Sequence, residues 1–152
     1  MARSKMNRER EYTSSMEDYL ETIKIIQEEN KSDGVKIKDI SEKMNVKMSS
    51  VNNALQTLSK LGLINYKPYK QVTLTSKGNK LAKKLYLKHK LLKDIFYNFF
   101  LLEEDIAEKI ACDIEHYIPE YIVKKLLIIR KQIIKNPSIS YNEIIKIIKN
   151  NK

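Results

Sequence analysis

The sequence predicts a mainly α-helical protein with a small β-wing, in which an N-terminal winged helix-turn-helix is followed by an all-α domain. Only three glycines and three prolines occur in 152 residues, so turn-forming residues are few. Apolar residues recur at helical spacing over most of the chain, and short β-rich runs occur only between residues 63 and 75. The 42% of hydrophobic residues is enough for one compact domain, or for two small domains that share a helix.

The first helix is expected to begin at a capping box, with Ser14 accepting a hydrogen bond from the Glu17 amide. Its apolar residues follow the i, i+3, i+4, i+7 spacing of one buried stripe: Met16, Tyr19, Leu20, Ile23 and Ile26. The helix is expected to end near Asn30, because residues 31–34 have the composition of a turn.

Two short helices are expected next, one around Ile40 and Met44 and one that begins at Ser49 and ends near Leu61. Gly62 suits the left-handed position that follows a helix. Two short helices joined by a tight turn and preceded by a longer helix form a helix-turn-helix. The runs 63–66 and 72–75 flank a lysine-bearing turn, so they predict a hairpin, which in this position is a wing.

The C-terminal half is expected to contain three further helices, over residues 76–100, 103–118 and 119–135. Pro119 suits the first turn of the last of these. A second capping box, from Ser140 to Glu143, predicts a short amphipathic helix at the C-terminus. The expected domains are a winged helix-turn-helix over 1–75, a helical domain over 76–136 and a short C-terminal helix over 137–152.

The net charge of +10 is concentrated in one part of the chain. Residues 36–90 hold 13 basic and 2 acidic side chains, whereas residues 1–35 and 91–152 carry net charges of −2 and +1. The 25 lysines occur beside 21 isoleucines and 12 asparagines, as an AT-rich genome would produce, but that bias would spread lysine evenly. The concentration therefore favours a polyanion-binding surface, with double-stranded DNA as the expected partner.

The candidate DNA-binding residues lie in this basic segment. A helix that enters the major groove needs short donors and acceptors at its N-terminal end, and flanking lysines suit phosphates. The alternative is that Asn52 and Asn53 are solvent-facing residues without a role in binding. The candidates are Lys47, Ser49, Ser50, Asn52, Asn53, Gln56, Lys67 and Lys70.

A second group of candidates lies on the helix expected over residues 103–118. Cys112, Glu115 and His116 fall at i, i+3 and i+4 and span a narrow arc that includes Glu108 one turn earlier, with isoleucines opposite. A thiol, a carboxylate and an imidazole suit a divalent transition metal, although a solvated polar face is the alternative. A single cysteine builds no intrachain disulfide, so Cys112 is a free thiol, a ligand or a buried small hydrophobe.

Five segments occur in a fixed order between residues 14 and 130: Ser15–Glu21, Ser49–Val51, Leu74–Gly78, Lys88–Leu92 and Ile114–His116. This ordered set resembles the diphtheria-toxin-repressor family of metal-dependent transcriptional repressors, and is most similar to its two-domain manganese-transport-regulator branch. The resemblance implies that residues 76–136 bind metal and form a dimer. It implies metal ligation by Asp18, Glu21, His89, Glu115 and His116.

Three positions bear on the match to the family pattern, and one of them is Gln71, which replaces a glycine usual in the wing. Cys112 falls where the manganese branch uses a glutamate and the iron branch a cysteine. Lys93 replaces an acidic residue expected one turn after His89, so an accessory metal site is expected to be altered, with Glu108 as a further candidate ligand. Carboxylate ligands suit Mn²⁺, whereas a thiolate favours Fe²⁺, and Zn²⁺ or Co²⁺ in vitro.

The function that the resemblance implies is metal-dependent transcriptional repression. A homodimer would bind palindromic operator DNA when Mn²⁺ or Fe²⁺ occupies a site between the DNA-binding and dimerisation domains, and would control metal-uptake genes. The alternative is a winged-helix regulator that responds to a small organic effector or to oxidation of Cys112. A metal-dependent hydrolase and a nonspecific architectural DNA protein are further alternatives.

The sequence also predicts what the protein is not. No H-E-x-x-H spacing, Gly-rich phosphate loop or nucleophile elbow occurs, so no enzyme is expected. No stretch approaches the roughly 18 consecutive apolar residues of a membrane span, and the N-terminus has no apolar signal core. We therefore expect a cytoplasmic protein without a membrane partner.

Overall fold

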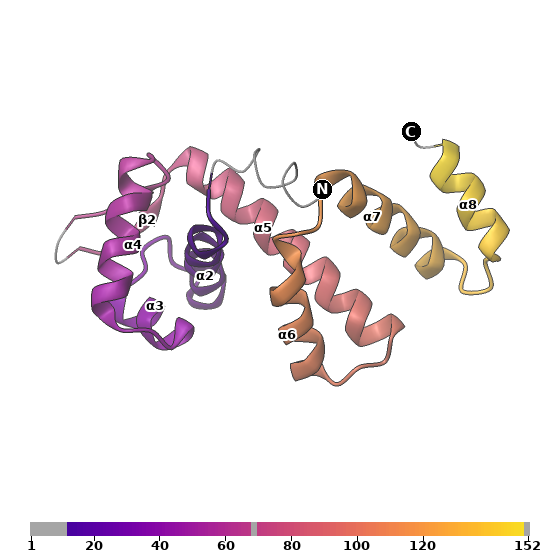
Figure 1. The fold of residues 1–152 in the computed structure, drawn as a ribbon, viewed down its shortest axis with the longest axis horizontal. Helices are drawn as coiled ribbons and strands as arrows, with labels where there is room; N and C mark the ends of the chain where they lie inside the picture. The colour runs from indigo at the N-terminus through magenta and orange to yellow at the C-terminus, as the bar shows by residue number, and fades with distance from the viewer. Residues whose placement is uncertain (1–11, 68–69, 151–152) are drawn as a thin grey trace, which may run out of the picture. The chain divides into compact units, whose positions relative to one another are not determined.

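The structure, a computed structural model, describes residues 12–67 and 70–150. The chain divides into two compact units, with the boundary between Tyr86 and Leu87. The described residues are mainly helical, with one small antiparallel sheet, which confirms the predicted fold class (Figure 1). The elements are α2 (Ser14–Asn30), α3 (Ile37–Met44), α4 (Met48–Lys60), β1 (Ile64–Asn65), β2 (Thr73–Leu74), α5 (Ser76–Asp94), the π-helix η1 (Ile95–Phe99), α6 (Glu104–Glu115), α7 (Glu120–Lys135) and α8 (Tyr141–Asn150).

The N-cap of helix α2 is one residue earlier than the sequence predicts. Thr13, in an extended conformation, is the N-cap, and its hydroxyl accepts a hydrogen bond of 3.3 Å from the Met16 amide. Ser14 is therefore the first helical residue, and the prediction that it caps the helix was wrong by one position. Thr13 and Ser14 both carry a hydroxyl that can cap a helix, and the backbone turns helical only after Thr13. The helix ends at Asn30, as predicted, because Lys31 adopts the left-handed conformation.

The helices α3 and α4 form the expected helix-turn-helix, in which α3 packs on both α2 and α4. Asn45 is left-handed (φ 52°) and ends α3, which redirects the chain into the tight turn before α4. Gly62 is left-handed (φ 69°) after α4, at the position predicted for it.

The wing is a two-stranded antiparallel hairpin. Ile64 pairs with Leu74 and Asn65 with Thr73, which confirms the hairpin but shortens each strand to two residues. The tip at residues 68–69 lies outside the described residues. Val35 forms a further bridge to Val72, with N–H···O distances of 2.9 and 2.8 Å in the two directions, so the segment before α3 is hydrogen-bonded to the wing.

One continuous apolar core holds the first unit together. It is built from α2, α3, α4, the wing and the first half of α5, and a buried leucine or isoleucine contributes about 1.5–3 kcal/mol. Gly78 allows α5 to begin against the wing, because a Cβ atom there would lie 1.8 Å from the Leu63 carbonyl oxygen. The buried core residues are Tyr19, Leu20, Ile23, Ile26, Val35, Ile40, Val51, Leu55, Leu58, Leu63, Ile64, Val72, Ala82 and Leu85.

The second unit contains the rest of α5 and the four helical segments that follow it. The expected helix over 76–100 is α-helical only to Asp94 and continues as η1, after which Leu101 takes a positive φ of 54°. Pro119 is the N-cap of α7 rather than a residue of its first turn, because its ψ of 153° is extended. The capping box of α8 is confirmed: the Ser140 amide donates to Glu143 (2.8 Å), and the Glu143 amide donates to Ser140 Oγ (3.3 Å).

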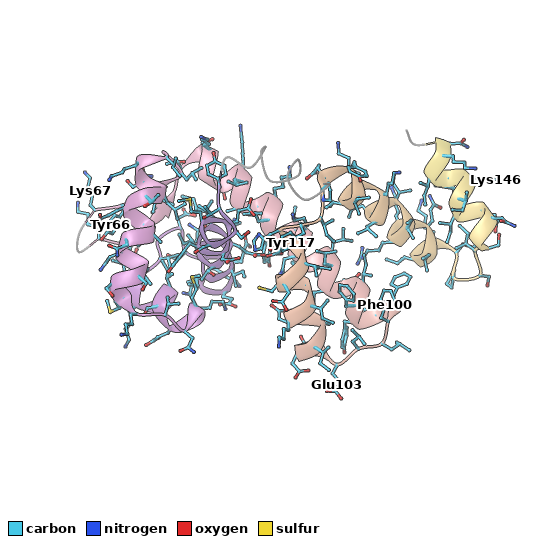
Figure 2. All side chains as sticks on the ribbon, in the orientation of Figure 1. Tyr66, Lys67, Phe100, Glu103, Tyr117 and Lys146 are labelled. Carbon is cyan, nitrogen blue, oxygen red and sulfur yellow. The ribbon has the colours of Figure 1, made fainter. Side chains whose placement is uncertain are left out.

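The second unit buries few apolar side chains and exposes many. Its buried apolar residues are Leu91, Leu92, Ala107, Ala111 and Val123. Figure 2 shows Phe100 and Glu103 in the connection between η1 and α6, where Phe100 is 65% exposed. Among the described residues, no helix is long and apolar enough to cross a membrane.

Candidate metal centre

The buried stripe of α6 ends in a carboxylate. Ala107, Ala111 and Glu115 are four residues apart and are fully buried. Four-residue steps keep side chains on one face of a helix, so Glu115 continues the row that the two alanines begin. His116 follows as the C-cap of α6 and is also buried, at 8% exposure.

His89 lies on the second half of α5 and contacts α6 through both ring nitrogens. Its Nδ1 lies 3.1 Å from Glu115 Oε2, and its Nε2 lies 3.0 Å from Glu108 Oε1. Leu85 and Leu92, one turn away on either side, are buried on the same face of α5. The imidazole is therefore held between two carboxylates rather than packed as an apolar core residue.

Glu115 provides the strongest sign that this cluster is built for a cation. Its carboxylate is fully buried, and among the described residues Oε1 has no hydrogen-bond partner. His116 Nε2 lies 3.6 Å from this oxygen, too far for a hydrogen bond. A buried carboxylate is costly unless it is paired or coordinates a metal. Glu115 has an imidazole nitrogen near each of its oxygens, from His89 at 3.1 Å and His116 at 3.6 Å, and carboxylate and imidazole are the ligand types that suit a divalent transition metal.

Lys93 lies at the edge of the same cluster. Its Nζ lies 2.9 Å from Glu108 Oε2 and 2.9 Å from Glu104 Oε1. Hydrogen bonds to Glu108 and Glu104 raise the pKa of Lys93 above its ordinary value. Burial works to raise the pKa of Glu108, but the hydrogen bond from Lys93 and the charge of His89 outweigh it, and the pKa is lowered. Glu104 is a member of this group that the sequence analysis missed, although it lies one turn before Glu108.

The four residues predicted on one arc of α6 divide into two environments. Glu115 and His116 are buried, whereas Cys112 and Glu108 are exposed. The alternative of a solvated polar face does not hold for all four residues, because the buried stripe passes through two alanines to Glu115, and His116 lies beyond the last helical residue. Exposure of Cys112 also excludes the interpretation of this thiol as a buried small hydrophobe.

The other two predicted ligands belong to the first unit. Asp18 and Glu21 lie one turn apart on α2, where Asp18 is half-buried and Glu21 is only 6% exposed. Glutamate is rarely buried to this extent unless it is paired or binds a cation. Burial singles out Glu21, which the i, i+3 spacing alone does not.

The predicted DNA-binding residues also divide by exposure. Seven of them are exposed, and Asn52 is half-buried because its Oδ1 accepts a hydrogen bond of 3.0 Å from the Tyr66 hydroxyl. Tyr66 and Lys67 lie in the first arm of the wing (Figure 2). The sequence analysis missed Tyr66, for which its place between the wing strand and the lysine-bearing turn was the only signal. The exposed candidates are Lys47, Ser49, Ser50, Asn53, Gln56, Lys67 and Lys70.

Comparison with known families assigns both halves of the chain. Residues 11–72 match the N-terminal DNA-binding domain of iron-dependent repressors, and residues 75–139 match their metal-binding and dimerisation domain. The chain belongs to the diphtheria-toxin-repressor family of iron-dependent repressors. Its members are transcriptional regulators, not enzymes, and the resemblance seen in the sequence is confirmed.

Individual relatives agree with this assignment. The chain is 39% identical over 116 residues to an uncharacterized HTH-type transcriptional regulator of Methanocaldococcus jannaschii, covering 76% of this chain and 92% of the relative. It is 39% identical over 106 residues to the HTH-type transcriptional regulator MntR of Shouchella clausii, covering 70% of this chain and 72% of the relative. A solved manganese-dependent transcriptional repressor in complex with manganese is similar at 26% identity and a TM-score of 0.65, over 73% of this chain. The match spans only 50% of that repressor's length.

Proposed function

We propose that this protein is a cytoplasmic transcriptional repressor that binds palindromic operator DNA as a homodimer when Mn²⁺ or Fe²⁺ is bound. The genes that it controls are metal-uptake genes. The observation that carries the proposal is Glu115, a fully buried carboxylate beside two histidines. The manganese dependence of the similar solved repressor supports the choice of metal. Residues 1–75 bind DNA, 76–136 bind metal and dimerise, and 137–152 add a short helix.

The proposed ligands are His89, Glu115 and His116 in the second unit, Asp18 and Glu21 in the first, and the Cys112 thiolate. When bound, a divalent cation supplies the positive charge that these carboxylates require. Burial of Glu21 and Glu115 supports the assignment, because both carboxylates are withdrawn from water. The two carboxylates of α2 and the three ligands of α5 and α6 are the set that the family resemblance implies.

Ligands from both units give the metal a regulatory effect. A dimer binds two half-sites only when its recognition helices match the spacing of successive major grooves, about 34–36 Å. Shared ligation restricts the arrangements that the two units adopt, so metal-loaded chains are preorganised for one spacing. By linkage, metal raises the affinity for DNA by the same factor by which DNA raises the affinity for metal.

On the DNA side, α4 is the proposed recognition helix and the wing lysines contact phosphates. Ser49, Ser50 and Asn53 are exposed at the N-terminal half of α4, where short side chains reach base edges. Lys47 precedes α4, and Lys67 and Lys70 flank the tip of the wing. Exposed apolar side chains of the second unit support its role in forming the homodimer.

The deciding experiment is a fluorescence-anisotropy titration of a palindromic promoter fragment at fixed salt, with Mn²⁺ or with a chelator. We expect tight binding with Mn²⁺ and at least a tenfold loss with the chelator, within the usual range of about 5–150-fold for allosteric coupling. Equal affinity in the two conditions would show that DNA binding does not depend on metal. Glu115→Gln should behave like the chelated wild type, and Asp113→Asn, an exposed change on the same helix, should behave like the metal-loaded one.

Cys112 decides the metal preference in this proposal. A thiolate ligand favours Fe²⁺ and later metals of the series over Mn²⁺, so Cys112→Glu should shift the preference towards Mn²⁺. The measurement is the ratio of Fe²⁺ to Mn²⁺ affinity, with Cys112→Ser as the control that removes the thiolate without adding a carboxylate. An unchanged ratio in both variants would exclude Cys112 as a ligand.

A further inference from the structure

A lysine lies where two carboxylates and an imidazole meet at the rim of the metal cluster. Lys93 is four residues after His89 on α5, and its ammonium bridges Glu104 and Glu108 of α6 at 2.9 Å each. All of these residues belong to the second unit. The ammonium thus contacts two acidic side chains that would otherwise repel each other across one turn of α6.

The contacts continue from the lysine into the metal cluster. One oxygen of Glu108 contacts Lys93, and the other lies 3.0 Å from His89 Nε2. His89 Nδ1 in turn lies 3.1 Å from the buried Glu115. Each link in this series joins a basic group to an acidic one, so Lys93 acts on His89 through Glu108.

Two carboxylates and one imidazole nitrogen are also a donor set for a divalent metal. In this chain an ammonium group, rather than a free cation, contacts both carboxylates. A second metal ion at this position would have to displace Lys93 or lie beside its positive charge, and either arrangement is unfavourable.

We propose that Lys93 is a built-in cation that takes the place of a second metal ion and positions Glu108 against His89, so that each chain binds a single metal. This rests on the proposed function, because it concerns the metal cluster described above. Glu108 is then a positioning residue for His89 in the wild type and becomes a metal ligand only when the lysine charge is removed. Metal sensing by this chain follows the occupancy of one ion.

The test is to count the Mn²⁺ ions bound per full-length chain by equilibrium dialysis and elemental analysis at fixed pH. We expect one ion for the wild type and two for Lys93→Gln. Lys93→Arg keeps the charge and should restore one ion, which a merely structural role of the lysine would not predict. Lys109→Gln removes a charge from an exposed position beside Glu108 and should leave one ion. The double variant Lys93→Gln with Glu108→Gln should lose the second ion again.

The outcomes separate this inference from the proposed function. One ion in both the wild type and a folded Lys93→Gln, with helicity checked by circular dichroism, overturns the inference and leaves the proposed function intact. Two ions in the wild type overturn it without any variant. A wild-type chain that binds no Mn²⁺ overturns the proposed function and this inference together.

Discussion

The two units of this chain contribute different kinds of buried side chain. In the described part of the first unit, fourteen buried apolar residues form one continuous cluster. Among the described residues of the second unit, only five apolar side chains are buried, and His89, Glu115 and His116 are buried as well. An apolar core stabilises a fold by itself, whereas a buried carboxylate with two imidazoles requires a further charge.

The second unit, which buries fewer apolar side chains, exposes more of them on its surface. Met48 is the one large exposed hydrophobic residue among those described in the first unit, and the second unit exposes ten. They include Leu101 at 84% exposure and Tyr97, Phe99 and Phe100 in and just after η1. The DNA-binding half therefore has an extensive apolar core and few exposed apolar side chains, whereas the other half has buried polar groups suited to a metal and an apolar surface suited to another copy of the chain.

The largest expected effect tests the apolar core of the first unit. Leu55→Ala should lower the free energy of unfolding by about 2–5 kcal/mol, because the side chain is fully buried and leaves a cavity. Leu101→Ala, its counterpart in the second unit, should change folding stability by less than about 0.5 kcal/mol. Urea unfolding with hydrogen exchange resolved for each unit measures both. Similar losses in the two variants would remove the contrast between the units.

Metal binding should stabilise the chain by the next largest amount. At a free Mn²⁺ concentration of 100 times the dissociation constant, binding raises the free energy of unfolding by about 2.7 kcal/mol. Glu115→Gln should abolish this gain, because the amide lacks the charge that draws a cation into the buried site. Thermal unfolding with and without Mn²⁺ provides the measurement, with Asp113→Asn as the control. A full metal-induced gain in Glu115→Gln would mean that Glu115 is not a ligand.

A smaller effect sharpens the role of the wing. Tyr66→Phe removes the hydrogen bond that holds Asn52 of α4 to the wing, and should cost about 0.5–1.5 kcal/mol in stability of the first unit. DNA affinity should fall as well, because the Asn52 side chain is no longer oriented. Tyr121→Phe, an exposed change in the second unit, is the matched control. If both variants bind DNA like the wild type, the contact does not contribute to recognition.

The smallest expected effect is a pH dependence confined to the second unit. The hydrogen bond from Arg130 lowers the pKa of Asp94, outweighing the effect of burial. A carboxyl group with a lowered folded-state pKa stabilises the protein above its unfolded pKa, near 4, and this stability is lost as the pH falls through the folded pKa. Both side chains are partly exposed, so the contribution is below about 1 kcal/mol.

Arg130→Met tests this pair, because it removes the hydrogen-bond donor and keeps a side chain of similar length. The difference in urea midpoint between this variant and the wild type should shrink as the pH is lowered from 7 to 3. A difference that is constant with pH would show that Arg130 contributes through packing alone.

Local patterns in the sequence predicted most of the fold. The stripe from Met16 to Ile26, the turn before α4 and the position of Gly62 are properties of neighbouring residues, and each led to the correct element. The errors are small: the N-caps of α2 and α7 lie at Thr13 and Pro119 rather than at the predicted positions, and the last residues of the helix expected over 76–100 form a π-helix. They arise because several adjacent residues can take the same terminal role, and the backbone selects one of them.

The candidate site was predictable in composition but not in arrangement. Residue identity and order were enough to nominate His89, Glu115 and His116. Helical spacing could not show that Cys112 and Glu115, three residues apart, differ in exposure, because that depends on which face of α6 packs inward. Nor could it pair Lys93 with Glu104 and Glu108, which belong to another helix.

The sequence by itself determined the family, the helical and winged architecture, and the basic segment proposed to bind DNA, because these follow from short-range spacing and from the order of motifs. Only the tertiary structure decided that Glu115 is fully buried with one oxygen lacking a hydrogen-bond partner among the described residues, and that a lysine contacts both neighbouring carboxylates. The reason is physical: burial and ion pairing depend on distances between side chains from different helices, which packing sets and sequence separation does not.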